Sequence, residues 1–279
     1  MYLSTSLLAA NDYVGMSFWL ACAIMLAAAV FFFVERSDVK GKWRTSLTVA
    51  GLVNGIAFWH YLYMREAHVA SLGGMADATT TVFRYIDWLV TVPLQIVEFY
   101  LILAAVTIVP LMLFWRLLGA SLVMLVFGFM GEAGLGDPML MFIIGMAGWI
   151  YIIYEVFAGE ASKLSVSSAN QGAQFAFNSL RLILTVGWAI YPIGYYLGMD
   201  SGGSDTANIV YNLADLVNKA AFGLVIWAGA KTWIRAQTAY LASGFCGRCC
   251  GLFGAVAPFV LQYRRGAHLL DGLAVALSL

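Results

Sequence analysis

Long apolar stretches alternate with short polar segments along most of the chain. A transmembrane helix needs about 20 mostly apolar residues. Stretches of this kind lie at approximately 13–34, 45–65, 80–103, 113–131, 139–158, 172–197 and 207–233. Gly55, Pro93, Gly187 and Pro192 fall inside them, and membrane helices tolerate such residues because neighbouring groups satisfy the freed backbone. The pattern predicts an all-α membrane protein, with a seven-transmembrane-helix bundle in residues 1–236 and an extension at 237–279.

Composition agrees with a protein that lies in a lipid bilayer. Hydrophobic residues make up 62% of the chain and charged residues 11%, and the mean hydropathy is +0.84. An ordinary soluble domain is less apolar. The formal net charge is zero and no basic run stands out, so nucleic-acid binding has no basis. The opening MYLSTSLLAAND lacks a basic region, and we expect any signal peptide to be absent or already removed.

Basic residues concentrate on one side of the predicted bundle. Cytoplasmic loops carry an excess of Lys and Arg, which sets the orientation of a membrane protein. The basic side carries Arg36, Lys40, Lys42, Arg44, Arg116, Lys163, Lys231 and Arg235, and the opposite side carries Asp12, Glu66, Asp77, Asp137, Asp200 and Asp205 with Arg65 near its boundary. We therefore expect a multi-pass membrane protein with its N-terminus outside and its C-terminus in the cytoplasm.

Cysteines cluster in the C-terminal extension. Cys246, Cys249 and Cys250 form the motif CGRCC. Such a cluster could bind a metal ion or carry palmitate. Three thiols without a nearby His also fit a set of unpaired thiols in the reducing cytoplasm, and we expect no metal site.

Ionisable residues in the third apolar stretch are the first sign of function, because charges inside a membrane helix are costly and mark functional sites. The stretch contains Arg84, Asp87, Thr91 and Glu98. At 100° per residue, Thr91 lies about 40° from Asp87, and Glu98 returns to within about 20° of it. The two carboxylates are about 16 Å apart along one face. This spacing suggests a proton path.

Asp215 and Lys219 lie one helical turn apart in the middle of the last apolar stretch. A buried amine needs a counter-ion or loses its proton, and a buried Lys is also the residue that forms Schiff bases with aldehydes. A structural ion pair is the alternative. Because the third and seventh stretches run in the same direction, a cation on Lys219 would have Asp87 and Asp215 on its outer side and Glu98 on its inner side.

His60 lies about 8 Å from the outer end of the second stretch, roughly as deep as Asp87. It is either a hydrogen-bonded structural residue or a partner whose titration is coupled to that of Asp87. The fourth stretch ends at Glu132, which we interpret as a solvated or interfacial carboxylate.

Four motifs together resemble the microbial rhodopsins, and within them the proteorhodopsin family of the blue-absorbing type. They are FWHYLYMR in the second stretch, RYIDWLVTVPL with EFYLIL in the third, GWAIYP in the sixth and NLADLVNK in the seventh. The resemblance extends from about residue 12 to residue 231. The chain departs from the family at its end, where GLFGAVAPFVL and HLLDGLAVALSL are too short to span a membrane and either lie at its interface or have no structure.

The resemblance implies a light-driven outward proton pump. Lys219 would bind all-trans retinal as a protonated Schiff base, with Asp87 as proton acceptor and counter-ion and Asp215 as second counter-ion. Glu98 would be the proton donor. Arg84 would tune the counter-ions, and Thr91 would hydrogen-bond near the acceptor.

The resemblance also implies further roles around the chromophore and between subunits. His60 would modulate the proton affinity of Asp87, and Trp19 would approach His60 of a neighbouring subunit in a homo-oligomer, a pentamer or hexamer. Gln95 would set blue absorption. The residues that would line the retinal are Trp88, Met124, Trp149, Trp188, Tyr191 and Pro192. Without a ligand, aromatic residues at helical spacing are usually packing.

Other functions are open to a chain of this pattern. Chloride pumps of the superfamily replace the acceptor carboxylate by a neutral residue, and sodium pumps carry Asn-Asp-Gln where this chain has Asp87, Thr91 and Glu98. The alternatives to a proton pump are a blue-light photosensory rhodopsin that signals through a partner with a slow photocycle, and a retinal-free receptor or transporter. None of these is an enzyme.

Overall fold

The computed structural model describes residues 8–74, 79–168, 170–199 and 205–249. The chain divides into two compact units, Met1–Trp233 and Ile234–Leu279. The first unit contains every functional residue proposed from the sequence. In the second unit, the described part is the last portion of a helix that ends at Cys249.

The described residues are helical and contain no strand. In chain order the elements are α1 (Tyr13–Glu35), η1 (Arg36–Asp38), α2 (Lys42–Leu72), α3 (Thr81–Ala104), α4 (Leu111–Glu132), α5 (Pro138–Phe157), α6 (Glu160–Ser167), α7 (Gln171–Leu182), η2 (Ile183–Gly187), α8 (Ile190–Met199) and α9 (Asp205–Cys249). Each of the seven stretches expected to cross the membrane is occupied by helix. The sixth stretch is built from α7, η2 and α8 in succession.

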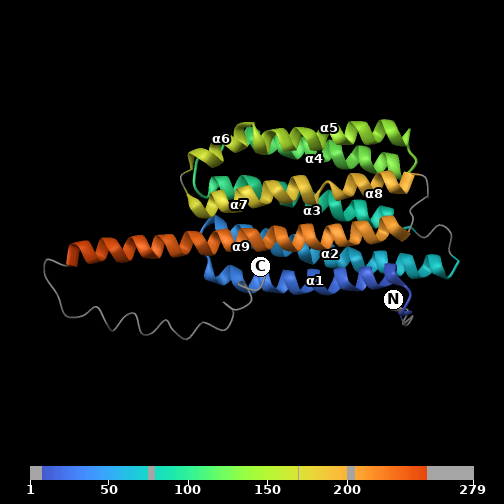
Figure 1. Cartoon of the computed structure of the whole chain (residues 1–279), viewed down its shortest axis with the longest axis horizontal. Helices are drawn as coiled ribbons and strands as arrows, with labels where there is room; N and C mark the ends of the chain where they lie inside the picture. Colours follow the sequence, from blue (N-terminus) through green and yellow to red (C-terminus); the bar gives the residue numbers. More distant parts are fainter. Residues whose placement is uncertain (1–7, 75–78, 169, 200–204, 250–279) are drawn as a thin grey trace. The chain divides into compact units, whose positions relative to one another are not determined.

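The helices of the first unit run side by side, and short connections join neighbours of opposite direction (Figure 1). Among the described residues, six helical segments are long and apolar enough to cross a membrane. The remaining long helix, α2, has 31 residues and carries His60, Arg65 and His68 within its length. Its polar side chains lower its mean hydropathy. Arg65 and His68 are buried inside the bundle rather than exposed to lipid.

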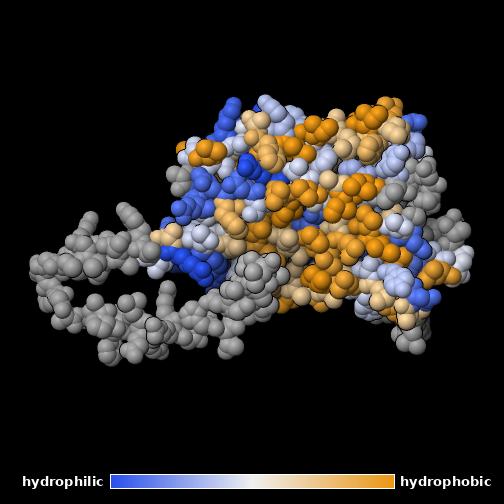
Figure 2. Space-filling model, viewed as in Figure 1, coloured by the Kyte–Doolittle hydropathy of each residue, from blue (hydrophilic) through white to orange (hydrophobic). Residues whose placement is uncertain are grey.

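Apolar side chains cover much of the outer surface of this unit. Figure 2 shows hydrophobic residues in a band across the helices, with hydrophilic residues gathered toward their ends. A soluble protein rarely exposes apolar surface on this scale. The distribution is that of a helical bundle whose side faces hydrocarbon.

A π-helical turn, η2, interrupts the sixth predicted helix. Such turns leave backbone carbonyls without their usual partners and are frequent at functional sites. Here the indole Nε1 of Trp149 donates to Leu184 O at 3.1 Å, and Asn218 Nδ2 donates to Gly187 O at 2.9 Å. A Cβ at Gly187 would lie 1.9 Å from Asn218 Oδ1. Glycine is therefore required where α9 approaches this turn.

The C-terminal extension is described only in part. The helix α9 continues beyond residue 236 to Cys249, so the boundary expected at 236 falls inside a helix, and the division of the chain there stays a prediction. Cys250 and the segments GLFGAVAPFVL and HLLDGLAVALSL lie outside the described residues. No group of three potential metal ligands occurs among the residues that are described.

Candidate functional site

A buried cation between two carboxylates forms the centre of the first unit. Lys219 of α9 donates from Nζ to Asp87 Oδ2 of α3 at 2.5 Å and to Asp215 Oδ2 at 2.8 Å. The lysine is 2% exposed and both carboxylates are 0% exposed. Buried charges are stable only when they are paired and hydrogen-bonded, so the three residues depend on one another. The one-turn spacing of Asp215 and Lys219 places both on the face of α9 that meets α3.

Asp215 has a hydrogen-bond donor on each carboxylate oxygen in addition to Lys219. The hydroxyl of Tyr61 donates to Oδ2 at 2.9 Å, and the hydroxyl of Tyr191 donates to Oδ1 at 2.7 Å. Trp88 Nε1 also donates to Oδ1, at 3.1 Å. Donors of this kind favour the ionised form of a carboxyl group. Asp215 is therefore held as a fixed negative charge.

Asp87 is much less constrained than Asp215. Its Oδ1 is buried and has no hydrogen-bond partner among the described residues. The ring nitrogen Nδ1 of His60 lies 3.6 Å from that oxygen. A carboxylate with one free oxygen and one oxygen against an amine has room to take a proton, which Asp215 does not.

His60 and Thr91 both lie beside Asp87 but contact the backbone more closely than the carboxylate. His60 Nδ1 is 3.0 Å from Ile56 O, within its own helix. The Thr91 hydroxyl donates to the main-chain oxygen of Asp87 at 2.9 Å. The structure thus brings both residues to the predicted acceptor, with Thr91 fixing the helix there rather than the carboxyl group.

Arg84 is buried on the same helix, one turn from Asp87 toward the N-terminus of α3. Its guanidinium donates to Asn212 Oδ1 at 3.1 Å, to Asn208 Oδ1 at 3.2 Å and to the Tyr61 hydroxyl at 3.4 Å. It also lies 5.0 Å from the ring centroid of Tyr211. Arg84 therefore connects to Asp215 through Tyr61 rather than by direct contact.

Glu132 was expected to be a solvated or interfacial carboxylate at the end of α4. It is partly buried and accepts a hydrogen bond of 2.7 Å from the Tyr211 hydroxyl. Because Arg84 lies against the other side of Tyr211, the three residues form a polar group next to the central cluster.

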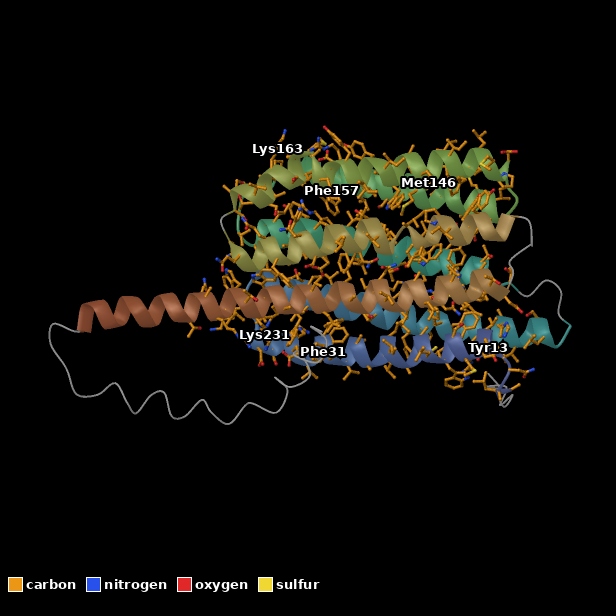
Figure 3. The ribbon with its side chains drawn as sticks, viewed as in Figure 1. Tyr13, Phe31, Met146, Phe157, Lys163 and Lys231 are labelled. Atoms are coloured by element: carbon orange, nitrogen blue, oxygen red, sulfur yellow. The ribbon has the colours of Figure 1, made fainter. Side chains whose placement is uncertain are left out.

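Glu98 is 0% exposed, and neither of its carboxyl oxygens has a hydrogen-bond partner in the described structure. It lies toward the C-terminal end of α3, the end at which Lys42 Nζ reaches Ala104 O. In Figure 3 the labels Lys163 and Lys231 mark this end of the bundle and Tyr13 marks the other. We call these the Lys231 end and the Tyr13 end. Glu98 lies between the central cluster and the Lys231 end.

A cavity opens beside the lysine, between α3, α4, α5, α8 and α9. It is lined by all of the residues expected to hold a chromophore, namely Trp88, Gln95, Met124, Trp149, Trp188, Tyr191, Pro192 and Lys219. Further wall residues are Tyr85, Val92, Leu125, Gly128, Glu132, Phe142, Gly145, Met146, Tyr195 and Tyr211. Residues from five helices thus converge on one apolar, largely aromatic space with a primary amine in its wall.

The residues present fit a long apolar aldehyde bound to Lys219. The walls are mostly aromatic and apolar, and their polar side chains besides the tyrosine hydroxyls are Lys219, Glu132 and Gln95. The buried Nε2 of Gln95 has no hydrogen-bond partner in the described part of the chain. The negative charges of Asp87 and Asp215 would balance a cation on Nζ.

Trp19 lies on the outer surface of α1, with half of its area exposed. The guanidinium of Arg65 lies 4.4 Å from its ring centroid. His60 keeps 17% of its side chain exposed. Both residues expected at a subunit boundary therefore reach the surface of this unit.

Sequence reasoning missed the residues that hold Asp215 and Arg84. Tyr61 directly follows His60 in the FWHYLYMR motif and was available as a polar group at the same depth. Asn208 and Asn212 lie four residues apart and precede Asp215 by seven and three residues, which places all three on one side of the helix. This regular spacing of amides before Asp215 could have been used to predict that they lie on the same buried face.

The fold and the site together define a seven-helix membrane protein with a reactive buried lysine. Comparison with known proteins identifies its family. A family described as bacteriorhodopsin-like protein matches residues 12–233. The chain belongs to this family.

Relatives of high identity are proteorhodopsins. A blue-light absorbing proteorhodopsin of Gamma-proteobacterium Hot 75m4 is 58% identical over 221 residues, which are 78% of this chain and 86% of that protein. A green-light absorbing proteorhodopsin of Gamma-proteobacterium EBAC31A08 is 56% identical over the same shares of the two chains. The resemblance read from the four motifs is confirmed.

A solved structure extends the comparison to three dimensions. The crystal structure of the blue light-absorbing proteorhodopsin from Med12 superimposes with a TM-score of 0.68 at 62% identity, and the match covers 78% of this chain and 98% of that chain. The predicted seven-helix membrane fold is confirmed. The family implies a retinal chromophore, which the fit of the cavity supports.

Proposed function

We propose that the protein pumps protons outward, driven by light, with retinal bound at Lys219. The observation that carries this proposal is the asymmetry around the amine. Lys219 Nζ touches Asp87, which has a free oxygen, while Asp215 is fixed by three further donors and Glu98 lies buried on the other side. This arrangement supplies a proton acceptor, a fixed counter-charge and a proton donor in one line.

The chain would hold all-trans retinal covalently at Lys219, with its polyene and ring among the apolar walls of the cavity. When bound, the retinal absorbs visible light and changes shape. Trp88, Trp188, Tyr191 and Pro192 would confine it, and Met124 and Trp149 would complete the walls. Gln95 places an amide beside it. An amide dipole near the amine end stabilises positive charge there in the ground state, which widens the energy gap and favours blue absorption.

Proton release begins at Lys219 Nζ. Nζ lies 2.5 Å from Asp87 Oδ2, which is hydrogen-bond distance, so transfer of a proton from Nζ to Asp87 needs no intermediary. Asp215 keeps its negative charge throughout because Tyr61, Trp88 and Tyr191 donate to it. The proton therefore moves to α3 and not to α9.

Proton return takes place on the side of the amine that faces the Lys231 end. Glu98 is 0% exposed and makes no direct hydrogen bond in the described structure, and in this proposal it holds a proton at rest. It gives its proton to Lys219 Nζ after Asp87 has been protonated. Since Asp87 and Glu98 lie on opposite sides of the amine along α3, each cycle moves one proton in one direction.

Three residues act on the acceptor. His60, 3.6 Å from Asp87 Oδ1, modulates the proton affinity of that carboxyl group. Thr91 fixes the main chain of α3 at Asp87 through its 2.9 Å hydrogen bond. Arg84 stabilises the negative charge of the site from the Tyr13 end, acting through Tyr61.

The direction of transport follows from the loop charges. The Lys231 end carries the basic loops and connections, and basic loops face the cytoplasm. The N-terminus then lies outside, and protons leave at the Tyr13 end. The protein is a multi-pass membrane protein, and the bacterial inner membrane is the membrane that these loop charges and its relatives suggest.

A homo-oligomer in the bilayer, a pentamer or hexamer, is part of this proposal. Trp19 and His60 both reach the outer surface of the unit. In the oligomer, Trp19 of one copy would lie near His60 of its neighbour. Arg65 above the Trp19 ring would hold the indole in place for that contact.

Illumination of unbuffered cells that express the protein with retinal tests the proposal. At an external pH above about 8, the medium should acidify in the light, and a protonophore should abolish the change. A photosensory protein would leave the external pH unchanged. Acidification that survives the protonophore, or its absence at alkaline pH, would contradict the proposal.

A further inference from the structure

The cavity beside Lys219 must receive its ligand from the bilayer, because a long apolar aldehyde dissolves in hydrocarbon rather than in water. At the Tyr13 end the way is closed by the polar group of Arg84, Tyr211 and Glu132. A ligand from the bilayer therefore has to pass between two neighbouring helices of the cavity wall. We call the contact line between two such helices a seam, and the packing of each seam indicates whether a ligand can pass.

The seams on both sides of α4 are closed by close contacts at glycines. Between α4 and α5, a Cβ at Gly148 would lie 2.6 Å from Ala120 O, which is a main-chain atom and cannot rotate away. Between α3 and α4, a Cβ at Gly128 would lie 3.0 Å from the Tyr85 hydroxyl. Phe129 packs on the Tyr85 ring with 5.3 Å between centroids. These helices leave no room for a ligand between them.

The seam between α8 and α9 is also closed. A Cβ at Gly194 would lie 2.5 Å from the Tyr211 ring, so the two helices touch there. One turn away, the Tyr191 hydroxyl donates to Asp215 Oδ1 at 2.7 Å. This hydrogen bond ends on a buried charge, and such bonds are stronger than those between neutral groups. Separation of α8 from α9 would therefore disturb the central cluster.

The seam between α5 and the segment formed by η2 and α8 is held differently. Two hydrogen bonds cross it near its ends. Trp149 Nε1 donates to Leu184 O at 3.1 Å, and the Tyr195 hydroxyl donates to Pro138 O at 2.9 Å. They are about 16 Å apart along α5. The side chains between them on α5 are apolar and contribute packing rather than hydrogen bonds.

Phe142 and Met146 fill the seam between these two bonds. Both line the cavity and both are partly exposed, and the residues that follow them, Ile143 and Ala147, are exposed on the outer face of α5. The Phe142 ring lies 5.2 Å from the Tyr195 ring between centroids. Methionine side chains are unbranched and adapt their shape easily. At this place, side chains rather than main chain separate the cavity from lipid.

We infer that retinal enters the cavity from the bilayer through the seam between α5 and α8, and that Phe142 and Tyr195 keep this entry closed. The inference rests on the retinal site of the proposed function. The entry opens when the side chains of Phe142 and Met146 rotate away and the Tyr195 hydroxyl releases Pro138 O. The aldehyde end passes first, because Lys219 belongs to α9, and α8 lies between α9 and α5 (Figure 1). Entry itself forms and breaks no covalent bond.

The first test measures how fast all-trans retinol enters the retinal-free protein in lipid vesicles. Retinol has the ring and polyene of retinal but no aldehyde, so it does not become attached to Lys219. Trp149 and Trp188 line the cavity, and the saturable part of the energy transfer from tryptophan to retinol after rapid mixing reports its arrival.

Two substitutions should speed this arrival. Phe142→Ala removes the ring that packs on Tyr195, and it should raise the rate about fivefold, which equals about 1 kcal/mol of activation free energy. Tyr195→Phe keeps the ring and removes only the hydrogen bond to Pro138 O, and it should raise the rate about threefold. If Phe142→Ala does not fold, Phe142→Leu and Tyr195→Phe are measured in its place.

Each substitution has a matched control. Phe129 is also partly exposed and packs on a tyrosine, Tyr85, but it lies at the seam between α3 and α4. The Tyr151 hydroxyl donates to Glu155 within α5 at 3.1 Å and crosses no seam in doing so. Phe129→Ala and Tyr151→Phe should therefore leave the arrival of retinol unchanged. Equal acceleration by Phe129→Ala and Phe142→Ala would contradict the inference.

The second test is the rate of colour formation in the dark after all-trans retinal is added at limiting concentration. It requires neither light nor proton transport. Phe142→Ala and Tyr195→Phe should form their pigments faster than the unmodified protein, and the two control variants should not. Equal rates of colour formation in all five proteins would contradict the inference.

The outcomes separate the inference from the proposed function. If the unmodified protein pumps protons but Phe142→Ala and Tyr195→Phe take up retinol at the original rate, the inference is wrong and the pump remains. If the unmodified protein takes up retinol but forms no coloured product with retinal, the attachment at Lys219 and with it the proposed function are wrong.

Discussion

Replacement of Asp87 by Asn tests the acceptor most sharply, because it removes one charge and preserves the shape of the side chain. Two opposite charges separated by the observed 2.5 Å attract by about 7 kcal/mol at an effective dielectric constant of roughly 20. Excitation of the retinal moves positive charge away from the nitrogen. If roughly half of the charge moves away, removal of the carboxylate narrows the energy gap by about 3 kcal/mol, roughly a twentieth of a visible photon.

The assay is the visible absorption spectrum of the purified retinal-bound variant at alkaline pH, together with light-driven proton release. Asp87→Asn should absorb farther to the red and should not release protons. Asp38→Asn is the matched control, since Asp38 is exposed and lies 3.2 Å from Lys231. It should keep both colour and transport. An unchanged spectrum in Asp87→Asn would refute the role of Asp87 as counter-ion, whatever its effect on transport.

Three further substitutions test the remaining roles. Glu98→Gln should slow proton return to Lys219 by at least about tenfold while leaving the colour nearly unchanged, and an unaltered return rate in flash spectroscopy would remove Glu98 as donor. Gln95→Leu should shift absorption to the red because the amide dipole is lost, and a blue shift would contradict that reasoning. Lys219→Ala should give no coloured pigment with retinal. The unmodified pigment should lose its colour in hydroxylamine under light. Colour that persists in Lys219→Ala would refute Lys219 as the attachment site.

Helical periodicity was enough to predict the line of groups on α3. Asp87, Thr91 and Glu98 share a face because 3.6 residues make a turn, and all three are buried. The pairing of Asp215 with Lys219 followed in the same way from their spacing. These are local relationships, and a sequence contains them directly.

Contacts between different helices could not be predicted from residue spacing. The hydrogen bonds of Tyr61, Trp88 and Tyr191 to Asp215 join α2, α3, α8 and α9, and no spacing within one helix predicts them. The same holds for the amides that bind Arg84. The shared direction of the third and seventh stretches placed Lys219 between the carboxylates, but the distinction between Asp215, with donors on both oxygens, and Asp87, with one unpaired oxygen, comes from the packing of the helices.

Local backbone irregularity was also missed. The sixth apolar stretch reads as one helix, but a π-helical turn occupies Ile183–Gly187. It is stabilised by side chains from α5 and α9, Trp149 and Asn218, which a single stretch does not reveal.

Thr91 was expected to form a hydrogen bond near the acceptor, and its partner is the main-chain oxygen of Asp87.

The most direct test of the central claim is a spectral titration of the retinal-bound protein from about pH 4 to about pH 10, combined at each pH with light-induced proton release. The absorption should shift to the blue as the pH rises, and outward proton release should appear over the same range. Both changes should be absent in Asp87→Asn. A spectrum that does not change with pH, or proton release that does not follow the spectral transition, would contradict the account.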